Sequence, residues 1–448
     1  MSEQLKTATP EPATTRTDAQ ETEVGSVFVS NYPPYSFWGK EYVPEVINAL
    51  NSAPTPAATL GLYLHIPFCR KRCKFCYFRV YTDKNSSDIQ TYLDALGTEV
   101  ELYSELPSVA DRPLHFVYFG GGTPSYISSN HLKALVKRIK ATLPWDSAEE
   151  VAFECEPGTL TRGKLDAIKE IGVTRLSLGV ENLNDDILAE NGRAHLSKEV
   201  YRVMPWIAAL EFDQVNIDLI AGMVGETWDS WRDTVERTID LNPDSITVYQ
   251  MELPFNTTYS KSIFGGEDLF VADWKTKREW HHYAFEQMAN AGYKMSSAYT
   301  MVKQDKQGKF VYRDAVWRGS DMLGTGVASF SHMSGVHFQN AASWDDYINS
   351  LHQNQLPLDR AFPTTPGERL TREMILQLKL GKIEIAHFRE KFGADILEVF
   401  GSTYQKLGDE GMLTLDKDAV TLTQKGLLRV DGLLPEFYAP KYQNARYT

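Results

Sequence analysis

Between residues 61 and 251 the chain alternates short apolar runs with longer segments that carry an apolar residue every three or four positions. Short apolar runs are typical of buried strands, and the longer period is typical of amphipathic helices. Six strands are expected, at residues 61–66, His115–Phe119, Val151–Cys155, Arg175–Val180, Val215–Ile220 and Ser245–Met251. The helices between and after them are expected at 87–103, 129–143, 161–171, 184–191, 197–210 and 227–240.

Strands that alternate with helices specify a parallel sheet with the helices outside. Six units are fewer than the eight of a closed barrel, so the pattern predicts an α/β fold of the partial (β/α)6 barrel type, open on one side and able to admit a large substrate. Chemistry is expected beyond the carboxyl ends of the strands. Ser86 or Ser87 is the expected N-cap of the first helix.

The chain after residue 256 changes in character. An amphipathic helix is expected near 272–291, a strand at Tyr293–Tyr299, and a glycine-rich turn at Leu323–Phe330 that closes the catalytic region. Residues 365–448 carry helical patterns near 368–380, 385–391 and 395–411, followed by a hairpin at Leu413–Leu422. Three helices and a hairpin predict a small winged-helix-like α+β domain, which we interpret as a lid or substrate platform.

The N-terminal segment has two parts. Residues 1–26 are rich in Thr, Glu, Ala, Pro and Gln, and we expect them to be disordered. Residues 27–60 form an arm whose aromatic and proline residues, 32–38, are expected to be extended and to pack on the main domain. The predicted organisation is thus tail 1–26, arm 27–60, barrel 61–255, extension with substrate region 256–364, and C-terminal domain 365–448.

Composition narrows the class of protein. The chain has 448 residues and a net charge of −13, which argues against a nucleic-acid-binding surface. Hydrophobic residues make up 42% of the chain, but no apolar run approaches the length of a membrane span. Cysteines that ligate a metal cluster have to stay reduced, so for such a site a reducing, cytoplasmic location is expected.

Three of the four cysteines, Cys69, Cys73 and Cys76, follow the first expected strand with the spacing Cys-x3-Cys-x2-Cys. Three thiolates on one loop can hold three irons of a [4Fe–4S] cluster and leave the fourth iron for a small molecule. A zinc site with His65 as fourth ligand is the alternative. A disulfide framework would leave one cysteine of the three unpaired. Cys155 is expected to be a small buried residue without a function.

Polar residues follow several other strands. A turn of three glycines, Gly120 to Gly122, comes after the second strand, and such a turn lets the backbone approach a ligand and exposes amides to an anion. Arg193 suits bidentate binding of a carboxylate, with a surface ion pair as the alternative. Asp218 interrupts an apolar strand, so a partner is expected for its carboxylate.

The cysteine spacing with Phe75, together with the preceding residues 63–68, resembles the signature of radical S-adenosyl-L-methionine (SAM) enzymes. The chain is similar, over roughly residues 55–340, to the oxygen-independent coproporphyrinogen III oxidase family, which also includes heme chaperones and class C radical SAM methyltransferases. The resemblance implies a [4Fe–4S] cluster on the three cysteines and SAM, with a second SAM molecule in some members. It also implies a flavodoxin or ferredoxin as one-electron donor.

The resemblance assigns roles to residues at the strand ends. The expected contacts to SAM are Tyr63, Gly121, Gly122, Thr123, Glu154, Glu181, Arg193 and Asp218. Glu181 and Arg193 are the expected catalytic residues. The family usually has glutamine where Glu181 stands, and a Cys-Gly-Cys ending where this chain has Cys76-Tyr77-Phe78.

Three functions follow from the resemblance. The first is oxidative decarboxylation of coproporphyrinogen III, in which a 5′-deoxyadenosyl radical takes a hydrogen atom from a propionate side chain. The second is methyl transfer to an aromatic or heterocyclic carbon with two SAM molecules. The third is a heme chaperone, which binds heme and passes it on without turnover. The substrate is therefore a tetrapyrrole or another small molecule.

Overall fold

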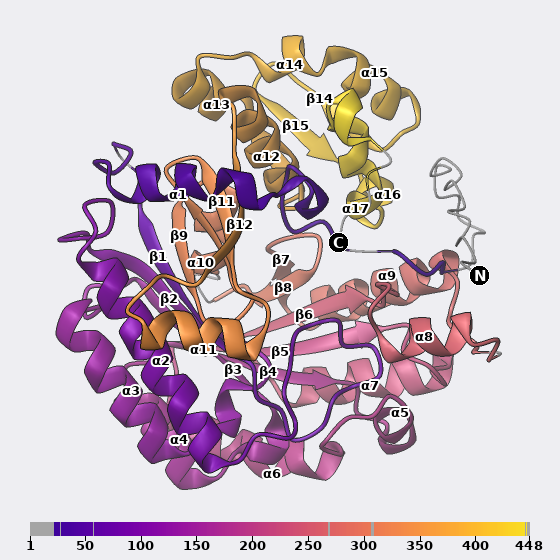
Figure 1. The fold of residues 1–448 in the computed structure, drawn as a ribbon. Coiled ribbons are helices and arrows are strands. Elements are labelled where there is room, and N and C mark those ends of the chain that lie inside the picture. The colour runs from indigo at the N-terminus through magenta and orange to yellow at the C-terminus, as the bar shows by residue number, and fades with distance from the viewer. Residues whose placement is uncertain are drawn as a thin grey trace, which may run out of the picture.

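A single sheet of twelve strands organises the computed structural model, which describes residues 22–26, 28–56, 58–267, 269–305, 309–443 and 445. Seven parallel strands form its middle, and antiparallel strands flank them on both sides (Figure 1). In spatial order they are β12 (Leu358–Pro363), β11 (Val336–Asn340), β10 (Phe330–Met333), β9 (Asp321–Thr325), β1 (Leu60–Ile66), β2 (Leu114–Gly121), β3 (Glu150–Cys155), β4 (Arg175–Glu181), β5 (Gln214–Ala221), β6 (Ser245–Gln250), β8 (Thr300–Lys303) and β7 (Tyr293–Met295). The sheet does not close on itself, so the predicted partial barrel is confirmed.

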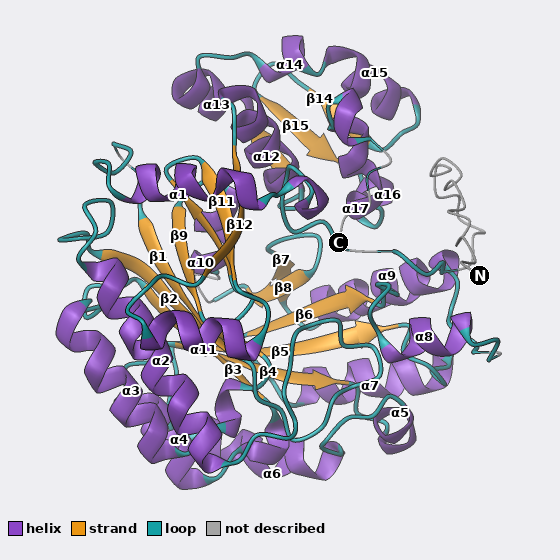
Figure 2. Ribbon diagram, viewed as in Figure 1, coloured by secondary structure: helices purple, strands orange, loops and turns teal. Residues whose placement is uncertain are grey.

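Helices cover the outer face of the parallel strands (Figure 2). They are α2 (Ser86–Ser104), α3 (Ser129–Thr142), α4 (Arg162–Glu170), α5 (Asp185–Glu190), α6 (Ser197–Ala208), α7 (Trp228–Asp240) and α9 (Trp274–Asn290). Four more lie elsewhere: α1 (Val43–Leu50), α8 (Thr258–Phe264), α10 (Val311–Trp317) and α11 (Trp344–His352). The predicted N-cap of α2 is wrong. Asn85 caps it instead, because its side chain accepts from the amides of Ser87 and Asp88 at 2.8 and 3.1 Å.

Two expected elements differ in the structure. Asp321–Thr325, expected within a turn region, is the strand β9 and pairs in parallel with β1. The strand expected at Tyr293–Tyr299 is instead a hairpin of β7 and β8, because the hydroxyl of Ser297 accepts from the amides of Tyr299 and Thr300, both at 3.2 Å, and turns the chain.

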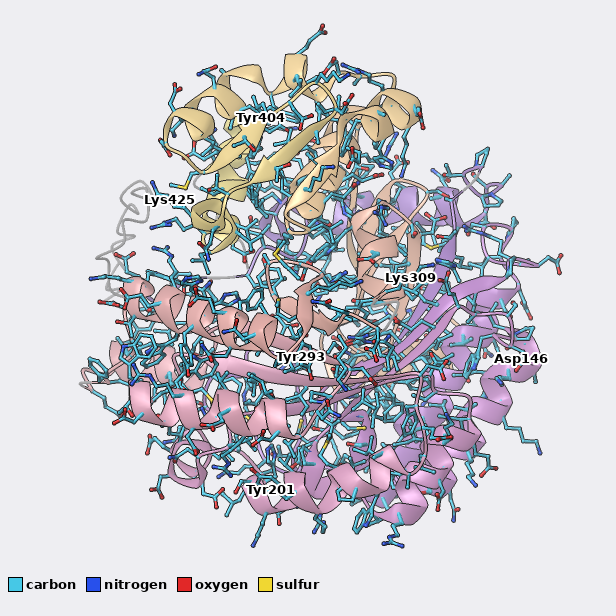
Figure 3. The ribbon with its side chains drawn as sticks, turned by 180° about the vertical axis from the view of Figure 1, so that it is seen from behind. Asp146, Tyr201, Tyr293, Lys309, Tyr404 and Lys425 are labelled. Atoms are coloured by element: carbon cyan, nitrogen blue, oxygen red, sulfur yellow. The ribbon has the colours of Figure 1, made fainter. Side chains whose placement is uncertain are left out.

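The C-terminal domain is a separate layer at the top of Figure 1. Its helices are α12 (Pro366–Leu378), α13 (Ile385–Phe392), α14 (Ile396–Val399), α15 (Gly401–Asp409), α16 (Gln424–Leu427) and α17 (Val430–Leu433). A three-stranded sheet in the order β13 (Lys382–Glu384), β15 (Ala419–Leu422), β14 (Leu413–Leu415) completes the winged-helix-like arrangement. Tyr404 is buried in its apolar core (Figure 3), which also includes Tyr32 of the arm and Trp317 of α10. The strand β13 was not expected.

The arm joins the barrel to this domain. Tyr32 packs on Tyr438 and Tyr442 of the C-terminal segment, with ring centroids 4.9 and 5.4 Å apart. Tyr35 packs on Phe330 of β10 at 4.4 Å. Residues 1–21 lie outside the described residues, so the predicted disorder is untested there. Residues 22–26, by contrast, hydrogen-bond to the barrel extension: the Gly25 amide donates to the Leu253 carbonyl at 2.7 Å.

No helix in the described part of the chain is both long and apolar enough to cross a membrane.

Candidate cofactor and substrate site

The cysteine loop leaves the carboxyl end of β1 and is tied down at both ends. The Cys69 amide donates to the Tyr81 carbonyl at 3.0 Å, and the Tyr81 amide donates to the Pro67 carbonyl at 2.7 Å. The Cys76 amide donates to the Cys73 carbonyl at 3.2 Å, which makes a turn between the second and third cysteine. The loop therefore places three half-buried thiols on one short stretch of backbone.

The thiols lie close enough to influence one another's charge. Burial, together with a smaller effect of a negative charge on Cys73, raises the pKa of Cys69 to about 11 and that of Cys76 to about 12. Thiolates are thus disfavoured here unless an adjacent cation stabilises them, which irons would do. The donor set of three thiols fits a [4Fe–4S] cluster with one iron left open.

The zinc alternative gains no support. The Nδ1 atom of His65 lies 3.5 Å from the hydroxyl of Tyr63.

The glycine turn after β2 crosses the end of β1 at close range. A Cβ atom on Gly122 would lie 2.9 Å from the carbonyl oxygen of Ile66, so only glycine fits there. The amides expected to face a ligand have partners within the protein: Gly121 donates to Glu154 at 3.1 Å, Gly122 to Ile66 at 2.9 Å and Thr123 to Phe68 at 2.9 Å. The turn therefore provides close approach, but the Gly121 and Gly122 amides, which were expected to face an anion, are bonded within the protein.

Glu154, at the end of β3, faces this turn as expected. Its carboxylate accepts from the Tyr118 hydroxyl at 2.7 Å and from the Gly121 amide. Burial raises the pKa of Glu154 to about 7, against the opposing effect of these two hydrogen bonds. Glu154 can therefore change charge near neutral pH, and a bound cation would keep it ionised.

Arg193 joins the cysteine loop to β4. Its Nη1 atom lies 3.2 Å from the Sγ atom of Cys73, and its Nη2 atom donates to the Gly179 carbonyl and lies 3.5 Å from the Oε1 atom of Glu181. Only 10% of the Arg193 side chain is exposed, so the surface-ion-pair alternative is wrong. Burial raises the pKa of Glu181 to about 7, while Arg193 opposes the shift.

Glu181 has an unusual backbone. Its φ is 66°, in the left-handed region, and the ladder between β4 and β5 is irregular between Gly179 and Glu181. Non-glycine residues adopt this region at a cost and are often found at functional sites. The bulge turns the Glu181 carboxylate toward Arg193.

Asp218 has the partners that its place in an apolar strand predicted. Its carboxylate accepts from the Ser177 hydroxyl at 2.8 Å and from the Asn216 amide at 3.0 Å. Burial raises its pKa. Ser177 and Asn216 were not predicted as site residues, although both are polar residues in apolar strands, which is the available signal.

Tyrosines line the inside of the barrel. The Tyr63 ring stacks on that of Tyr118 at 5.7 Å, and Tyr118 packs on Tyr312 of α10 at 4.2 Å. At the end of the cysteine loop Tyr77 stacks on Phe78 at 4.4 Å, and both rings are exposed, by 40% and 45%. Tyr312 was missed by the sequence analysis, because it comes from a helix outside the six units.

Cys155 is buried, as expected.

Comparisons with known proteins agree with this geometry. Residues 63–238 match the Radical SAM superfamily, and residues 364–429 match the HemN C-terminal domain. The chain is 26% identical to an oxygen-independent coproporphyrinogen III oxidase of Synechocystis sp. over 91% of both chains. It is 27% identical to the heme chaperone HemW of Bacillus subtilis, over 82% of this chain and 96% of that protein.

The structure resembles that of coproporphyrinogen III oxidase from Escherichia coli, with a TM-score of 0.79, 22% identity, and coverage of 92% of this chain and 96% of the other. The fold and the cysteine loop are those of a radical SAM protein. The chain combines a Radical SAM domain with a HemN C-terminal domain, and its relatives are oxygen-independent coproporphyrinogen III oxidases and heme chaperones. Its cofactors are a [4Fe–4S] cluster and SAM, and it requires a reductant and a small-molecule substrate.

Proposed function

We propose that the protein is an oxidoreductase that removes carbon dioxide from propionate side chains of coproporphyrinogen III in porphyrin synthesis. A hydrogen atom leaves the propionate chain, and loss of carbon dioxide and one further electron to an acceptor leaves a vinyl group. The observation that carries the proposal is the position of Arg193, which meets the cysteine loop and Glu181 beside a tyrosine-lined lumen. The oxidase of Synechocystis sp. also matches a larger share of this chain than the chaperone of Bacillus subtilis does, 91% against 82%.

Each residue has a defined task in this proposal. Cys69, Cys73 and Cys76 hold the cluster, and Thr123 lies 3.3 Å from the Sγ atom of Cys69, where its hydroxyl can hydrogen-bond a thiolate. The cluster and SAM together supply a carbon-centred radical at the 5′ position of deoxyadenosine.

The remaining residues orient SAM. Arg193 binds its carboxylate, Glu154 accepts from its ammonium group, and Asp218, with Tyr63 nearby, binds its ribose. Gly121 and Gly122 allow the close approach. Glu181 influences how strongly Arg193 binds a further carboxylate, because its own carboxylate lies 3.5 Å from that guanidinium.

A second candidate is methyl transfer with two SAM molecules. The observation in its favour is the exposed Tyr77–Phe78 stack, which stands where the oxidases of this family usually end their cysteine motif in Cys-Gly-Cys. A stacked aromatic pair suits a planar aromatic or heterocyclic acceptor.

The test is anaerobic. Protein reconstituted with iron and sulfide is incubated with dithionite, SAM and coproporphyrinogen III, and mass spectrometry follows both SAM products and the tetrapyrrole. The proposal expects 5′-deoxyadenosine together with loss of carbon dioxide from the tetrapyrrole. 5′-Deoxyadenosine with S-adenosylhomocysteine and an unchanged tetrapyrrole would replace it with methyl transfer. Tight heme binding without SAM cleavage would replace both with a chaperone.

A further inference from the structure

A basic cleft lies on the outside of the barrel, beside the cysteine loop. Its volume is 380 Å³, and it is bounded by the cysteine loop, the turn after β3 and the start of α6. Its charged lining consists of Arg70, Lys71, Arg193, Lys198, Arg202 and, as the single acid, Glu199. Five positive side chains therefore face one concavity in a chain whose net charge is −13.

Most of these charges are accessible to a partner. Lys71 is exposed, and the Lys198 side chain is 74% exposed, with the Nζ atom 3.9 Å from Glu199. Arg202 is exposed and lies over the Trp206 ring at 5.8 Å. Arg162 of α4 also lies over the Trp206 ring, 5.4 Å from its centroid, so positive side chains of α6 and α4 meet at this tryptophan.

The acidic side chains near the cleft each contact another group of the protein. Glu199 accepts from the Leu196 amide at 2.9 Å and caps α6, and Asp185 accepts from the Ser197 amide at 2.7 Å. Glu156 lies against Arg70 and His195 inside the wall, at 3.2 and 3.0 Å. Glu190 pairs with Lys74 of the cysteine loop at 2.8 Å. The positive excess of the cleft comes from its lining, in which five Lys and Arg side chains stand against the one carboxylate of Glu199.

The cleft is separated from the cluster ligands by one side chain. Arg193 lines the cleft and also contacts the Sγ atom of Cys73 at 3.2 Å. Arg70 and Lys71 follow Cys69 directly in the chain. The helix α6 lies at the bottom of the view in Figure 1, away from the C-terminal domain at the top, so a large partner here would not meet that domain.

We propose that this basic cleft is the docking surface for an acidic one-electron carrier protein of the flavodoxin or ferredoxin class. The proposal rests on the radical chemistry of the proposed function and not on the identity of the substrate. The carrier loses one electron and the cluster gains it, with no bond formed or broken. A local positive surface on an acidic protein orients a negatively charged partner and speeds its association, while the rest of the surface repels it.

The test compares two double variants with the same change in charge. Lys198→Glu/Arg202→Glu reverses the cleft. The control, Lys137→Glu/Arg232→Glu, changes an exposed lysine on α3 and an arginine that lies over Trp228 on α7, at 5.0 Å, as Arg202 lies over Trp206. Both variants carry the reconstituted cluster. Stopped-flow absorbance follows reduction of the cluster by pre-reduced flavodoxin, by ferredoxin and by dithionite, in the absence of tetrapyrrole, and surface plasmon resonance measures carrier binding.

The proposal expects the cleft variant to lose about tenfold or more in carrier binding and in the rate of reduction by the carrier. Reduction by dithionite should not change, and the control should behave as wild type. Added salt should slow the wild type and have less effect on the cleft variant. Equal rates of reduction by the carrier for the cleft variant and the control would overturn the proposal. So would a wild-type protein that neither carrier reduces, or a cleft variant whose reduction by dithionite slows as much as its reduction by the carrier. Failure to convert coproporphyrinogen III would leave these rates unaffected, so the two proposals fail separately.

Discussion

The Nη1 atom of Arg193 lies 3.2 Å from the Sγ atom of Cys73, across 120 positions of sequence. The same guanidinium lies 3.5 Å from the Glu181 carboxylate. One cation is therefore shared between a cluster ligand and an acid of β4, next to the open side of the cysteine loop. In the proposed function the carboxylate of SAM is a third group that binds this guanidinium.

The first prediction concerns Glu181→Gln, which restores the residue usual in the family. Because burial raises the pKa of Glu181 to about 7, its carboxyl is mostly neutral at pH 6 and mostly charged at pH 8. The charged form competes with SAM for Arg193. The variant should therefore bind SAM about as well as wild type at pH 6, and about three- to tenfold more tightly at pH 8.

Equilibrium dialysis of the cluster-loaded proteins measures this ratio. Both proteins keep Glu154. Because the charge of Glu181 contributes to the raised pKa of Glu154, the variant also ionises Glu154 more readily, and this effect acts in the same direction. Arg193→Lys is the companion variant and should weaken SAM binding at both pH values, because lysine lacks the planar fork that binds a carboxylate through two nitrogens. An equal ratio at pH 6 and pH 8 would contradict the competition.

The second prediction is that Cys69, Cys73 and Cys76 are each required and Cys155 is not. Alanine at any of the three should abolish cluster assembly and SAM cleavage, because the remaining two thiols cannot hold the cubane. Cys155→Ala should keep both and cost only about 1–2 kcal/mol of stability. Iron and sulfide analysis with electron paramagnetic resonance measures this. A full [4Fe–4S] signal in Cys73→Ala would contradict the assignment.

The fold was predictable where the information is local. The apolar periods of 61–251 placed β1 to β6 and their helices within a few residues. Strand β9 was missed because Gly324, Thr325 and Gly326 show no apolar alternation, and its pairing with β1 joins segments more than 250 positions apart. Gly324 is needed there because a Cβ would lie 2.1 Å from the Phe330 carbonyl oxygen.

The three cysteines were predictable as a site because they lie within eight positions of one another in the sequence. The position of Arg193 against Cys73 depends on how the turn after α5 folds back, which no local pattern encodes. The glycine turn shows the opposite error. Its sequence suggests free amides, but the crossing of β1 uses the Gly122 and Thr123 amides in bonds to Ile66 and Phe68.

The third prediction concerns Tyr118→Phe. The Tyr118 hydroxyl donates to Glu154 and lowers the pKa of this acid, which burial raises to about 7. Only ionised Glu154 attracts the ammonium group of SAM. In a Glu181→Gln background, which lacks the opposing titration of Glu181, SAM binding should therefore strengthen as pH rises through about 7. Loss of the hydroxyl should move that midpoint up by about one pH unit, since a hydrogen bond to a charged group contributes about 1.5 kcal/mol or more.

The SAM dissociation constant measured from pH 6 to pH 9 tests the shift. Tyr312→Phe is the control, because Tyr312 packs on the Tyr118 ring at 4.2 Å but has no hydrogen bond to Glu154 among the described contacts. Identical midpoints for Glu181→Gln with and without Tyr118→Phe would contradict the role of the hydroxyl.

The fourth prediction concerns stability. Glu99 of α2 is fully buried and accepts from the Tyr347 hydroxyl and the Asn340 side chain, both at 2.6 Å, and from the Gly326 amide at 2.8 Å. Burial raises its pKa to about 7 from an ordinary value near 4.5. The folded state then binds more protons than the unfolded state between these values, so stability falls as pH rises from about 4.5 to 7.

Glu99→Gln removes this titration. The free energy of unfolding of wild type relative to the variant should therefore decrease between pH 5 and pH 8, by about 3 kcal/mol for a shift of this size. Urea unfolding of the cluster-free proteins at three pH values measures it. Parallel pH profiles for the two proteins would contradict the assignment.

The fifth prediction concerns Tyr77 and Phe78, whose stacked rings are exposed next to the last cluster ligand. If they form a platform for a planar ring of the substrate, Tyr77→Ala and Phe78→Ala should each raise the KM for the substrate by about three- to tenfold, the energy of one aromatic stacking contact. Tyr77→Phe should keep the stack and stay near wild type. Cluster content and SAM cleavage without substrate should not change in any of the three. A fall in kcat with unchanged KM would instead place the pair in the radical step, because only a contact made more strongly in the transition state lowers kcat alone.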